Sequence, residues 1–428
     1  MGYHDIYKSC QDNPEAYWLE QSKAIDWEEA PRQALFDKGN DLYEWFADAK
    51  VNACYNAVDR HVENGRADQV AIIHDSPITG TQTKITFAEL QTRVAAVAGA
   101  LQANGVGKGD RVIIYMPMVP EALEAMLACA RIGAVHSVVF GGFASNELAV
   151  RINDCTPKAI IAASCGLEPA RVVAYKPLLD GAIEQADHKP DFCLILQREQ
   201  APCDLTPGRD LDWHAAQKGT TPAPCLAVEG NHPAYILYTS GTTGAPKGVV
   251  RQTAGHLVAL NWTMKNIYNV DPGDVFWAAS DVGWVVGHSY ICYGPLVHGN
   301  TTVVFEGKPV GTPDAGTFWR VISEHNVRSF FTAPTAIRAV KREDPKGEEI
   351  GKYDISCLRA LYLAGERADP DTVIWAQEKL GIPVYDHWWQ TETGYTIVGN
   401  PAGLEALPVK VGSPTVPMPG YDVQILNE

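Results

Sequence analysis

The chain has 428 residues, of which 46% are hydrophobic and 20% are charged, and this composition excludes a disordered or collagen-like protein. At roughly 150 residues per domain, the length predicts two or three domains, or one large one. With 35 Lys and Arg against 51 Asp and Glu, the net charge is −16. This balance argues against nucleic acid as a partner, because such a surface needs clustered cations.

The ten cysteines are scattered along the chain and form no CxxC pair, so we expect reduced core residues in a cytoplasmic protein. The N-terminus lacks the basic-then-apolar pattern of a signal peptide. Residues 282–305 carry no formal charge, but they include His288, Pro295 and Asn300. We therefore expect no membrane helix and no membrane partner. The oligomeric state is left open.

In chain order, residues 1–50 are polar and aromatic, and they predict a helical extension that packs on the main body. Thr86 and Glu89 then predict a capping box at the start of a helix that Gly105 ends. Further helices are expected from Pro120 and Ser145. Apolar runs predict strands at 111–115, 135–140, 158–163, 192–196, 234–238, 301–305, 329–332, 358–363 and 383–386.

Apolar strands that alternate with helices are typical of parallel sheets covered on both faces. The fold class is therefore α/β, with two βα lobes at about 51–220 and 221–405 in a core that spans 51–405. Residues 197–233 are rich in Pro, Gly and Asp and are interpreted as a long surface connection. The alternation over 421–425 predicts a strand, and residues 406–428 are interpreted as the start of an incomplete β-rich subdomain.

The most specific stretch is YTSGTTGAPKG, from Tyr238 to Gly248, directly after an apolar strand. Glycines let the backbone wrap closely around phosphates, and hydroxyl and N–H groups supply donors. Lys247 adds a positive charge. The spacing does not fit a Walker A loop, which excludes a P-loop NTPase. A flexible surface loop is the alternative.

A second stretch, YDHWWQTETG from Tyr385 to Gly394, also follows a strand. Two adjacent tryptophans cannot share one face of a strand, so one could stack on a flat ring while the other walls a pocket. Thr391 and Glu392 offer a hydroxyl and a hard oxygen ligand for Mg²⁺. An ordinary aromatic cluster with a surface Glu is the alternative.

Two more stretches follow strands: LAGER from Leu363 and DVGWVVGHSY from Asp281. His288 could act as a base, although a single His in an apolar run is more often structural. Ligands of parallel α/β sheets bind beyond the carboxyl ends of the strands. The shared position of the four stretches therefore predicts one nucleotide site.

These stretches, together with FTAPTAIRA from Phe331, resemble the motifs of the adenylate-forming acyl-CoA synthetases, and within them the short-chain acetyl-/propionyl-CoA synthetases. The resemblance covers most of the chain. It implies the large N-terminal domain of the adenylate-forming fold and the substrates and cofactors ATP, Mg²⁺, coenzyme A and a small carboxylate. The reaction would form an acyl-AMP and then pass the acyl group to CoA.

The resemblance also implies a role for each matching residue. Catalysis would involve Lys247, Thr391 and Glu392, with Glu392 as the Mg²⁺ ligand. ATP would be bound by Thr239, Ser240, Gly241, Thr242, Thr243, Gly244, Lys247, Gly365, Glu366, Arg367, Asp386, His387, Trp388, Trp389, Gln390 and Thr391. The acyl pocket would comprise Trp284, Val285, Ala364 and Trp389, and the CoA site Gly141, Gly142, Arg171 and Val286.

The acid is suggested by Ala364, because acetate-specific relatives typically have Val at this position. The smaller side chain leaves room for a longer acyl chain, while Trp389 would still block a fatty one, so propionate is favoured over acetate. One methylene in an apolar pocket is worth about 1–3 kcal/mol, so we expect a preference rather than exclusion. An acetate–CoA ligase is the alternative.

Some positions depart from the family pattern, among them Glu168, where a CoA-binding Arg is common. No stretch matches the family's later ribose-binding Asp, its hinge or its C-terminal lid with the catalytic Lys. We therefore expect the chain to be the N-terminal core without that lid. Residues 1–428 alone would then be weakly active or inactive, which leaves a nucleotide- and acyl-AMP-binding module as a further alternative.

Overall fold

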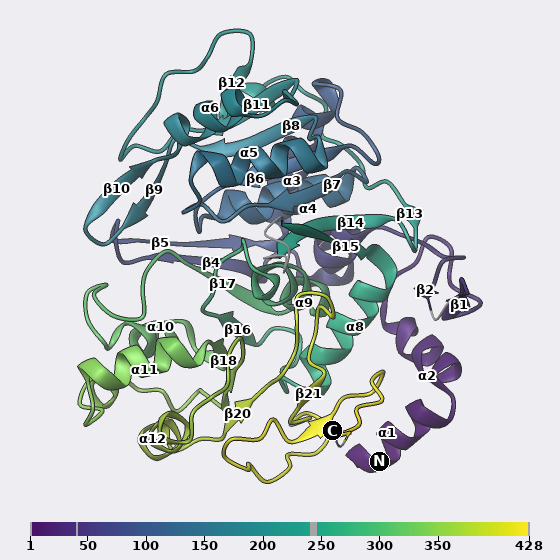
Figure 1. Cartoon of the computed structure of the whole chain (residues 1–428), viewed down its shortest axis with the longest axis vertical. Coiled ribbons are helices and arrows are strands. Elements are labelled where there is room, and N and C mark those ends of the chain that lie inside the picture. The colour runs from purple at the N-terminus through teal and green to yellow at the C-terminus, as the bar shows by residue number, and fades with distance from the viewer. Residues whose placement is uncertain (1, 40–41, 240–245, 427–428) are drawn as a thin grey trace.

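The structure, a computed structural model, describes residues 2–39, 42–239 and 246–426. Two seven-stranded sheets form its framework (Figure 1). In order across the first sheet, the strands are β12 (Asp210–Asp212), β11 (Phe192–Leu196), β8 (Ala159–Ala163), β6 (Arg111–Tyr115), β7 (Val135–Val138), β14 (Pro233–Thr239) and β15 (Lys247–Gln252). All neighbours are parallel except β14 and β15.

The second sheet is also mainly parallel, with one antiparallel pair. Its strands, in order, are β20 (Val384–Asp386), β19 (Ala360–Leu363), β18 (Val327–Thr332), β16 (Val275–Ala278), β17 (Thr301–Phe305), β4 (Val70–Ser76) and β5 (Thr81–Thr86). Only the β4–β5 pair is antiparallel.

Helices cover both faces of each sheet, so the layers alternate. The central layer shares one core with both sheets and contains α3 (Phe87–Ala103), α4 (Pro120–Arg131), α8 (Thr253–Asn266), α9 (Gly294–His298) and the helical turns η2 (Tyr55–Asp59) and η4 (Gly287–Tyr293). The outer face of the first sheet carries α5 (Ser145–Cys155) and α6 (Tyr175–Gln185). That of the second sheet carries α10 (Thr317–His325), α11 (Pro334–Glu343) and α12 (Pro370–Leu380).

Strand β6 shows why these strands are apolar throughout. Val112 and Ile114 belong to the central core, whereas Ile113 and Tyr115 pack with α5 and α6. Successive side chains of a strand point to opposite faces, and here both faces are buried. The prediction of an α/β fold with mainly parallel sheets is confirmed.

Local signals also placed several boundaries correctly. Helix α3 begins after the Thr86–Glu89 capping box, α4 begins at Pro120, and α5 begins at Ser145. The predicted strands 111–115 and 192–196 match β6 and β11 residue for residue.

Two local predictions were wrong. Residues 197–233 are not only a surface connection, because they contain the edge strand β12 and the helix α7 (Trp213–Gln217), whose Trp213 is buried. Residues 421–425 form no strand, since no described segment pairs with them; the late ladder instead joins β21 (Val398–Gly399) to β22 (Val416–Pro417).

Both halves of the chain contribute strands to both sheets. Strands β4 and β5 lie in the second sheet, whereas β14 and β15 lie in the first. Each sheet therefore takes strands from both halves of the chain, and the lobe boundary near residue 220 stays a proposal.

The N-terminal segment packs against the main body. Helices α1 (Tyr3–Asp12) and α2 (Pro14–Gln21) lie beside the C-terminal segment (Figure 1). The Tyr3 hydroxyl donates to the carbonyl oxygen of Pro417 at 2.7 Å, and the Tyr7 hydroxyl to that of Tyr421 at 2.8 Å. The segment is not purely helical, because it also holds β1 (Leu35–Asp37), β2 (Tyr43–Trp45) and β3 (Lys50–Val51).

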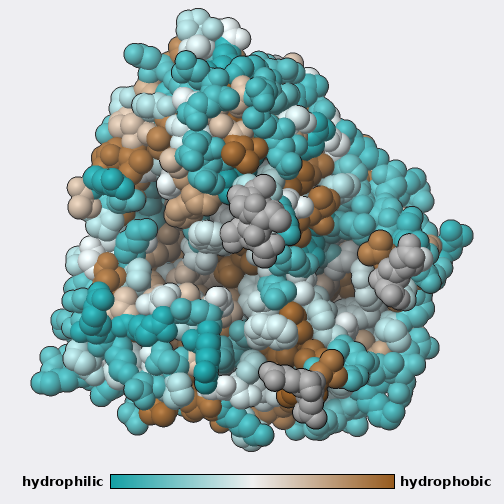
Figure 2. Space-filling model, in the orientation of Figure 1, coloured by the Kyte–Doolittle hydropathy of each residue, from teal (hydrophilic) through white to brown (hydrophobic). Residues whose placement is uncertain are grey.

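Among the described helices, none combines the length and the apolar character that crossing a membrane requires. Residues 287–305 fold instead into η4, α9 and the buried strand β17. The face of the molecule in Figure 2 is mostly hydrophilic, and hydrophobic patches lie in the hollow across its middle.

Candidate functional site

The hairpin β14–β15 carries the two ends of the glycine-rich loop. Thr239 and Lys247 face each other in its antiparallel ladder, and Lys247 is exposed. The predicted phosphate-binding residues between them, Ser240, Gly241, Thr242, Thr243 and Gly244, lie outside the described residues. Antiparallel pairing thus fixes where the loop leaves and rejoins the first sheet.

The carboxyl ends of β19 and β20 bring two further motifs together. Leu363 and Asp386 are partners in the parallel ladder, and the His387 N–H donates to the Leu363 carbonyl at 2.8 Å. Gly365, which follows β19, has φ +105°, a conformation that favours glycine. Gly365, Glu366 and Arg367 are exposed, and Glu366 pairs with Arg338 at 2.5 Å.

Asp386 is the acidic group at this edge. Burial raises the pKa of its carboxyl to about 6, although N–H groups of Ala368 and His387 partly oppose the shift. The side chain can therefore change charge close to neutral pH.

The three residues that follow Asp386 point in different directions. His387 is buried near the rings of Tyr268 and Tyr362, and burial lowers its pKa to about 3, so it is neutral. Trp388 is 47% exposed. Trp389 is half-buried against Tyr290, with ring centroids 5.5 Å apart. The expected split between the two tryptophans is present, whereas the imidazole of His387 lies in the core.

Ala364 and Trp389, two predicted acyl-pocket residues, both reach the end of β18. The Ala364 N–H donates to the Thr332 carbonyl at 3.3 Å, and the Trp389 ring lies 6.4 Å from that of Phe331. Val285 packs against the same core. Trp284, the fourth, is half-exposed and stacks on Phe140 instead.

The turn 390–394 presents the predicted phosphate and metal residues. Thr391 is half-buried and Glu392 is exposed. Among the described residues, neither side chain has a hydrogen-bond partner. A hydroxyl and a carboxylate are hard oxygen donors that fit Mg²⁺. The backbone of the turn is held by Arg251 and Ser289, which sequence reasoning missed; the one signal was that Arg251 follows Lys247 by four residues on a strand.

Three of the four predicted CoA residues line one cavity of about 400 Å³. Gly141, Gly142 and Arg171 border it together with Trp284 and Tyr175. A Cβ at Gly141 would collide with Tyr175, and one at Gly142 with Phe140, so the glycines keep the space open. Val286 is not among the lining residues and packs against the central core.

Glu168, the departure from the family pattern, forms an ion pair with Arg171 at 2.7 Å across the β9–β10 ladder (Cys165–Glu168 and Arg171–Ala174). The pairing lowers the pKa of the Glu168 carboxyl. The guanidinium that the resemblance assigns to CoA is therefore already shared with a carboxylate.

His288 is a buried side chain that bonds to the backbone. Its Nδ1 is 2.9 Å from the Trp284 carbonyl oxygen, and the side chain is fully buried. Burial lowers its pKa to about 4, despite this hydrogen bond. The structural interpretation of this histidine is therefore the better one.

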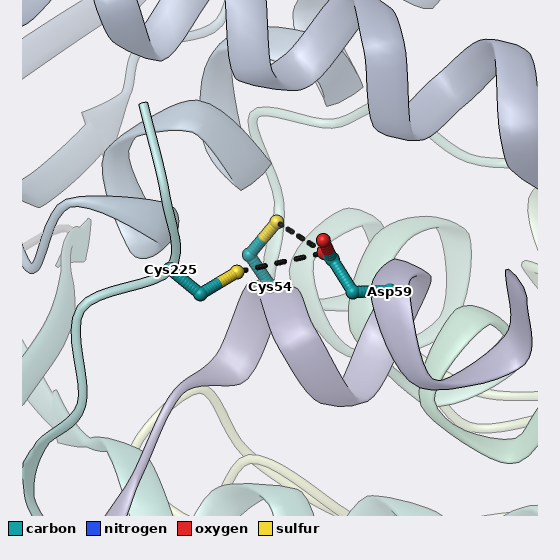
Figure 3. Close-up of side chains that lie close together, drawn as sticks. All are labelled: Cys54, Asp59 and Cys225. Atoms are coloured by element: carbon teal, nitrogen blue, oxygen red, sulfur yellow. Dashed lines mark hydrogen bonds between the residues drawn. The ribbon is translucent and has the colours of Figure 1, made fainter. Parts of the chain in front are cut away.

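Two clusters of ligand-type side chains lie apart from these motifs among the described residues, and one of them contains cysteines. Cys54, Asp59 and Cys225 place their ligand atoms within 4.8 Å of one another (Figure 3). However, Arg131 binds both oxygens of Asp59, at 2.7 and 3.0 Å, and its Nη1 lies 3.5 Å from the Cys54 sulfur. A cation at this point would face a guanidinium, so the cluster does not fit a metal centre.

Two family models match consecutive segments of the chain. The model of the AMP-binding enzyme family matches residues 58–428, and that of the acetyl-coenzyme A synthetase N-terminus matches residues 3–57. The whole chain is 55% identical to an uncharacterised Pseudomonas aeruginosa protein, covering 68% of its length.

Two named relatives are also similar over the whole chain. One is the human acyl-CoA synthetase short-chain family member 3, mitochondrial, at 50% identity and 62% of its length. The other is the Escherichia coli propionate–CoA ligase, at 44% identity and 68% of its length. The chain thus spans about two-thirds of the length of the curated relatives it matches. The chain belongs to the AMP-binding enzyme family, in its short-chain acyl-CoA synthetase branch.

Proposed function

We propose that the full-length protein is an ATP-dependent propionate–CoA ligase. The observation that carries this choice is Ala364, buried at the end of β19 directly before Gly365. Its small side chain takes up little volume at the β18 end, where the ring of Trp389 also lies. The similarity to a propionate–CoA ligase supports the same choice.

In the proposed first step, a propionate oxygen attacks the α-phosphorus of ATP, and the bond to pyrophosphate breaks. Lys247, Thr239 and the loop between them would hold the β- and γ-phosphates, and Thr391 the α-phosphate. Asp386 and Trp388, beside Gly365, Glu366 and Arg367, would meet the adenine. The protein would act through positioning and charge neutralisation, and so needs no covalent nucleophile.

Mg²⁺, bound through Glu392, would offset the negative charge of the phosphates. Glu392 fits this role because its carboxylate is exposed beside the Thr391 hydroxyl. Propionyl-AMP would then react with the CoA thiol. The new C–S bond forms, the C–O bond to AMP breaks, and the thiol proton is lost. The cavity bordered by Gly141, Gly142 and Arg171 is the proposed approach for CoA.

The test is a comparison of kcat/KM for propionate and acetate with the full-length protein. We expect the higher value for propionate, by roughly 10- to 200-fold, because one buried methylene is worth about 1–3 kcal/mol. A higher kcat/KM for acetate would replace the proposal with the acetate–CoA ligase alternative.

We further propose that residues 1–428 alone bind nucleotide and acyl-AMP but form little thioester, since the relatives are about half as long again. Binding of a non-hydrolysable propionyl-AMP mimic without propionyl-CoA formation is expected. Rapid CoA ligation by this chain would contradict it. The cytoplasmic location stays a prediction.

A further inference from the structure

Four consecutive carbonyl oxygens in the turn after the tandem tryptophans accept hydrogen bonds from side chains of other elements. Nη2 of Arg251 donates to the carbonyl oxygens of Thr391 at 2.7 Å and Glu392 at 3.0 Å. Nη1 of Arg251 donates to that of Thr393 at 3.5 Å, and the Ser289 hydroxyl donates to that of Gly394 at 2.7 Å. One guanidinium and one hydroxyl thus set the direction of the whole turn.

The turn is built to receive this guanidinium. Gly394 has φ +78°, and a Cβ there would lie 2.8 Å from Cζ of Arg251. The turn also closes on itself, since the N–H groups of Thr393 and Gly394 both donate to the Gln390 carbonyl. With the carbonyls of Thr391 and Glu392 directed at Arg251, their side chains are left unpartnered among the described residues.

Arg251 also connects this turn to the glycine-rich loop. It lies on β15, four residues after Lys247. Residues at even spacing on a strand share a face, so Lys247 and Arg251 point to the same side, about 13 Å apart at 3.3 Å per residue. The strand that leaves the loop therefore carries the residue that orients the 391–394 turn.

Arg251 forms no ion pair with a carboxylate in the described ranges. Its two Nη groups donate to backbone oxygens, while its buried Nε has no hydrogen-bond partner there. A half-buried guanidinium with such partners serves to fix backbone geometry, because its fork offers several donors in one plane.

We propose that Arg251 is a positioning residue for MgATP. It holds Thr391 and Glu392 in the geometry that meets the α-phosphate and the metal, and it links that geometry to the strand after the glycine-rich loop. The inference rests on the proposed function only in that these two side chains contact the nucleotide.

The experiment uses the full-length protein and the variants Arg251→Gln, Arg251→Lys and Ser289→Ala. Arg111→Gln is the matched control, since Arg111 also donates to three carbonyl oxygens, those of Cys155, Gly109 and Thr156, but at the start of β6. Binding of Mg²⁺ with a non-hydrolysable ATP analogue is measured by calorimetry. ATP–pyrophosphate exchange with propionate and the KM for CoA are measured in parallel.

We expect Arg251→Gln to weaken analogue binding at least tenfold and to slow exchange, with the KM for CoA unchanged. Arg251→Lys should recover only part of the binding, and Ser289→Ala should lose about threefold. Arg111→Gln should lower the unfolding temperature without changing binding. If Arg251→Gln fails to fold, Arg251→Lys and Ser289→Ala provide the same test.

Analogue binding by Arg251→Gln within twofold of the wild type would overturn the inference. Full recovery of analogue binding by Arg251→Lys, with no effect of Ser289→Ala, would also overturn the inference. That result would indicate a direct contact between the side chain and a phosphate, because such a contact needs only a point charge. A wild type that binds the analogue but catalyses no exchange would refute the proposed function, while the comparison of binding would still test Arg251.

Discussion

The indole ring of Trp284 is stacked on the ring of Phe140, with centroids 5.6 Å apart and planes at 30°. Both rings line the proposed CoA cavity, and Trp284 is in addition a predicted acyl-pocket residue. We therefore propose that the pair joins the two substrate sites.

Phe140→Ala should weaken the binding of both propionate and CoA. Loss of an aromatic pair costs about 0.5–1.5 kcal/mol, so we expect the KM values for propionate and CoA each to rise roughly 2- to 10-fold, with the KM for ATP unchanged. Steady-state kinetics of the full-length protein measure this. A change confined to ATP would contradict the placement of Trp284 between the two sites.

Ala364→Val should shift the acid preference towards acetate. Ala364 is 4% exposed, so two added methyl groups would take volume from the proposed acyl pocket. The ratio of kcat/KM for propionate to that for acetate is expected to fall about 10- to 200-fold. The matched control is Ala149→Val on α5, 6% exposed, which should cost stability without changing the ratio.

Asp386 should make nucleotide binding dependent on pH. With a pKa of about 6, its carboxylate forms as the pH rises from 5 to 7 and can then accept hydrogen bonds from adenine. Affinity for ATP should therefore rise over this window. Asp386→Asn removes the titration, so its ratio to the wild type isolates this effect from the titration of ATP itself. A constant ratio would contradict the prediction.

The raised pKa of Asp386 affects stability in the opposite direction, because stability should fall as the pH rises. Because burial raises the folded-state pKa of Asp386 from 3.8 to about 6, its contribution is full below about pH 4 and is lost as the pH rises through 6. Urea unfolding of the wild type relative to Asp386→Asn should show this loss. A difference that stays constant between pH 4 and 7 would show that the carboxyl is not shifted.

Arg131→Met should destabilise the fold, because it leaves Asp59 charged and buried; both side chains are 7% exposed. Breaking one half of a buried pair costs about 3–5 kcal/mol. The free energy of unfolding in urea measures this. The double variant Arg131→Met/Asp59→Leu should recover part of the loss, and a single-variant cost below about 1 kcal/mol would contradict the assignment.

The sequence predicted elements well where local chemistry decides them. The Thr86–Glu89 box and Pro120 mark helix starts through contacts within one turn. The strand predicted over residues 421–425 was wrong. Alternation predicts an extended chain, but only pairing with a neighbouring strand makes that chain part of a sheet. The burial of Trp213 was missed for a similar reason, because its helix α7 packs against α3, more than 100 residues earlier in the chain.

The candidate site also contains residues that the sequence could predict and residues that it could not. The motifs after β19 and β20 meet at one edge, as the parallel-sheet argument predicted. Arg251 could not be found from its own neighbourhood, because its contacts lie 140 to 142 residues further along the chain. His387 shows the converse, since its motif suggested a ligand contact while tertiary packing buries its ring.

The bonds from Tyr3 and Tyr7 to the carbonyls of Pro417 and Tyr421 each join residues 414 positions apart. During translation at about 5–20 residues per second, the first helix would wait roughly 20 to 80 s for these acceptors to be made. Until then the apolar face of α1, including Tyr3 and Cys10, stays uncovered on the ribosome. The nascent N-terminus is thus a segment that a chaperone could shield.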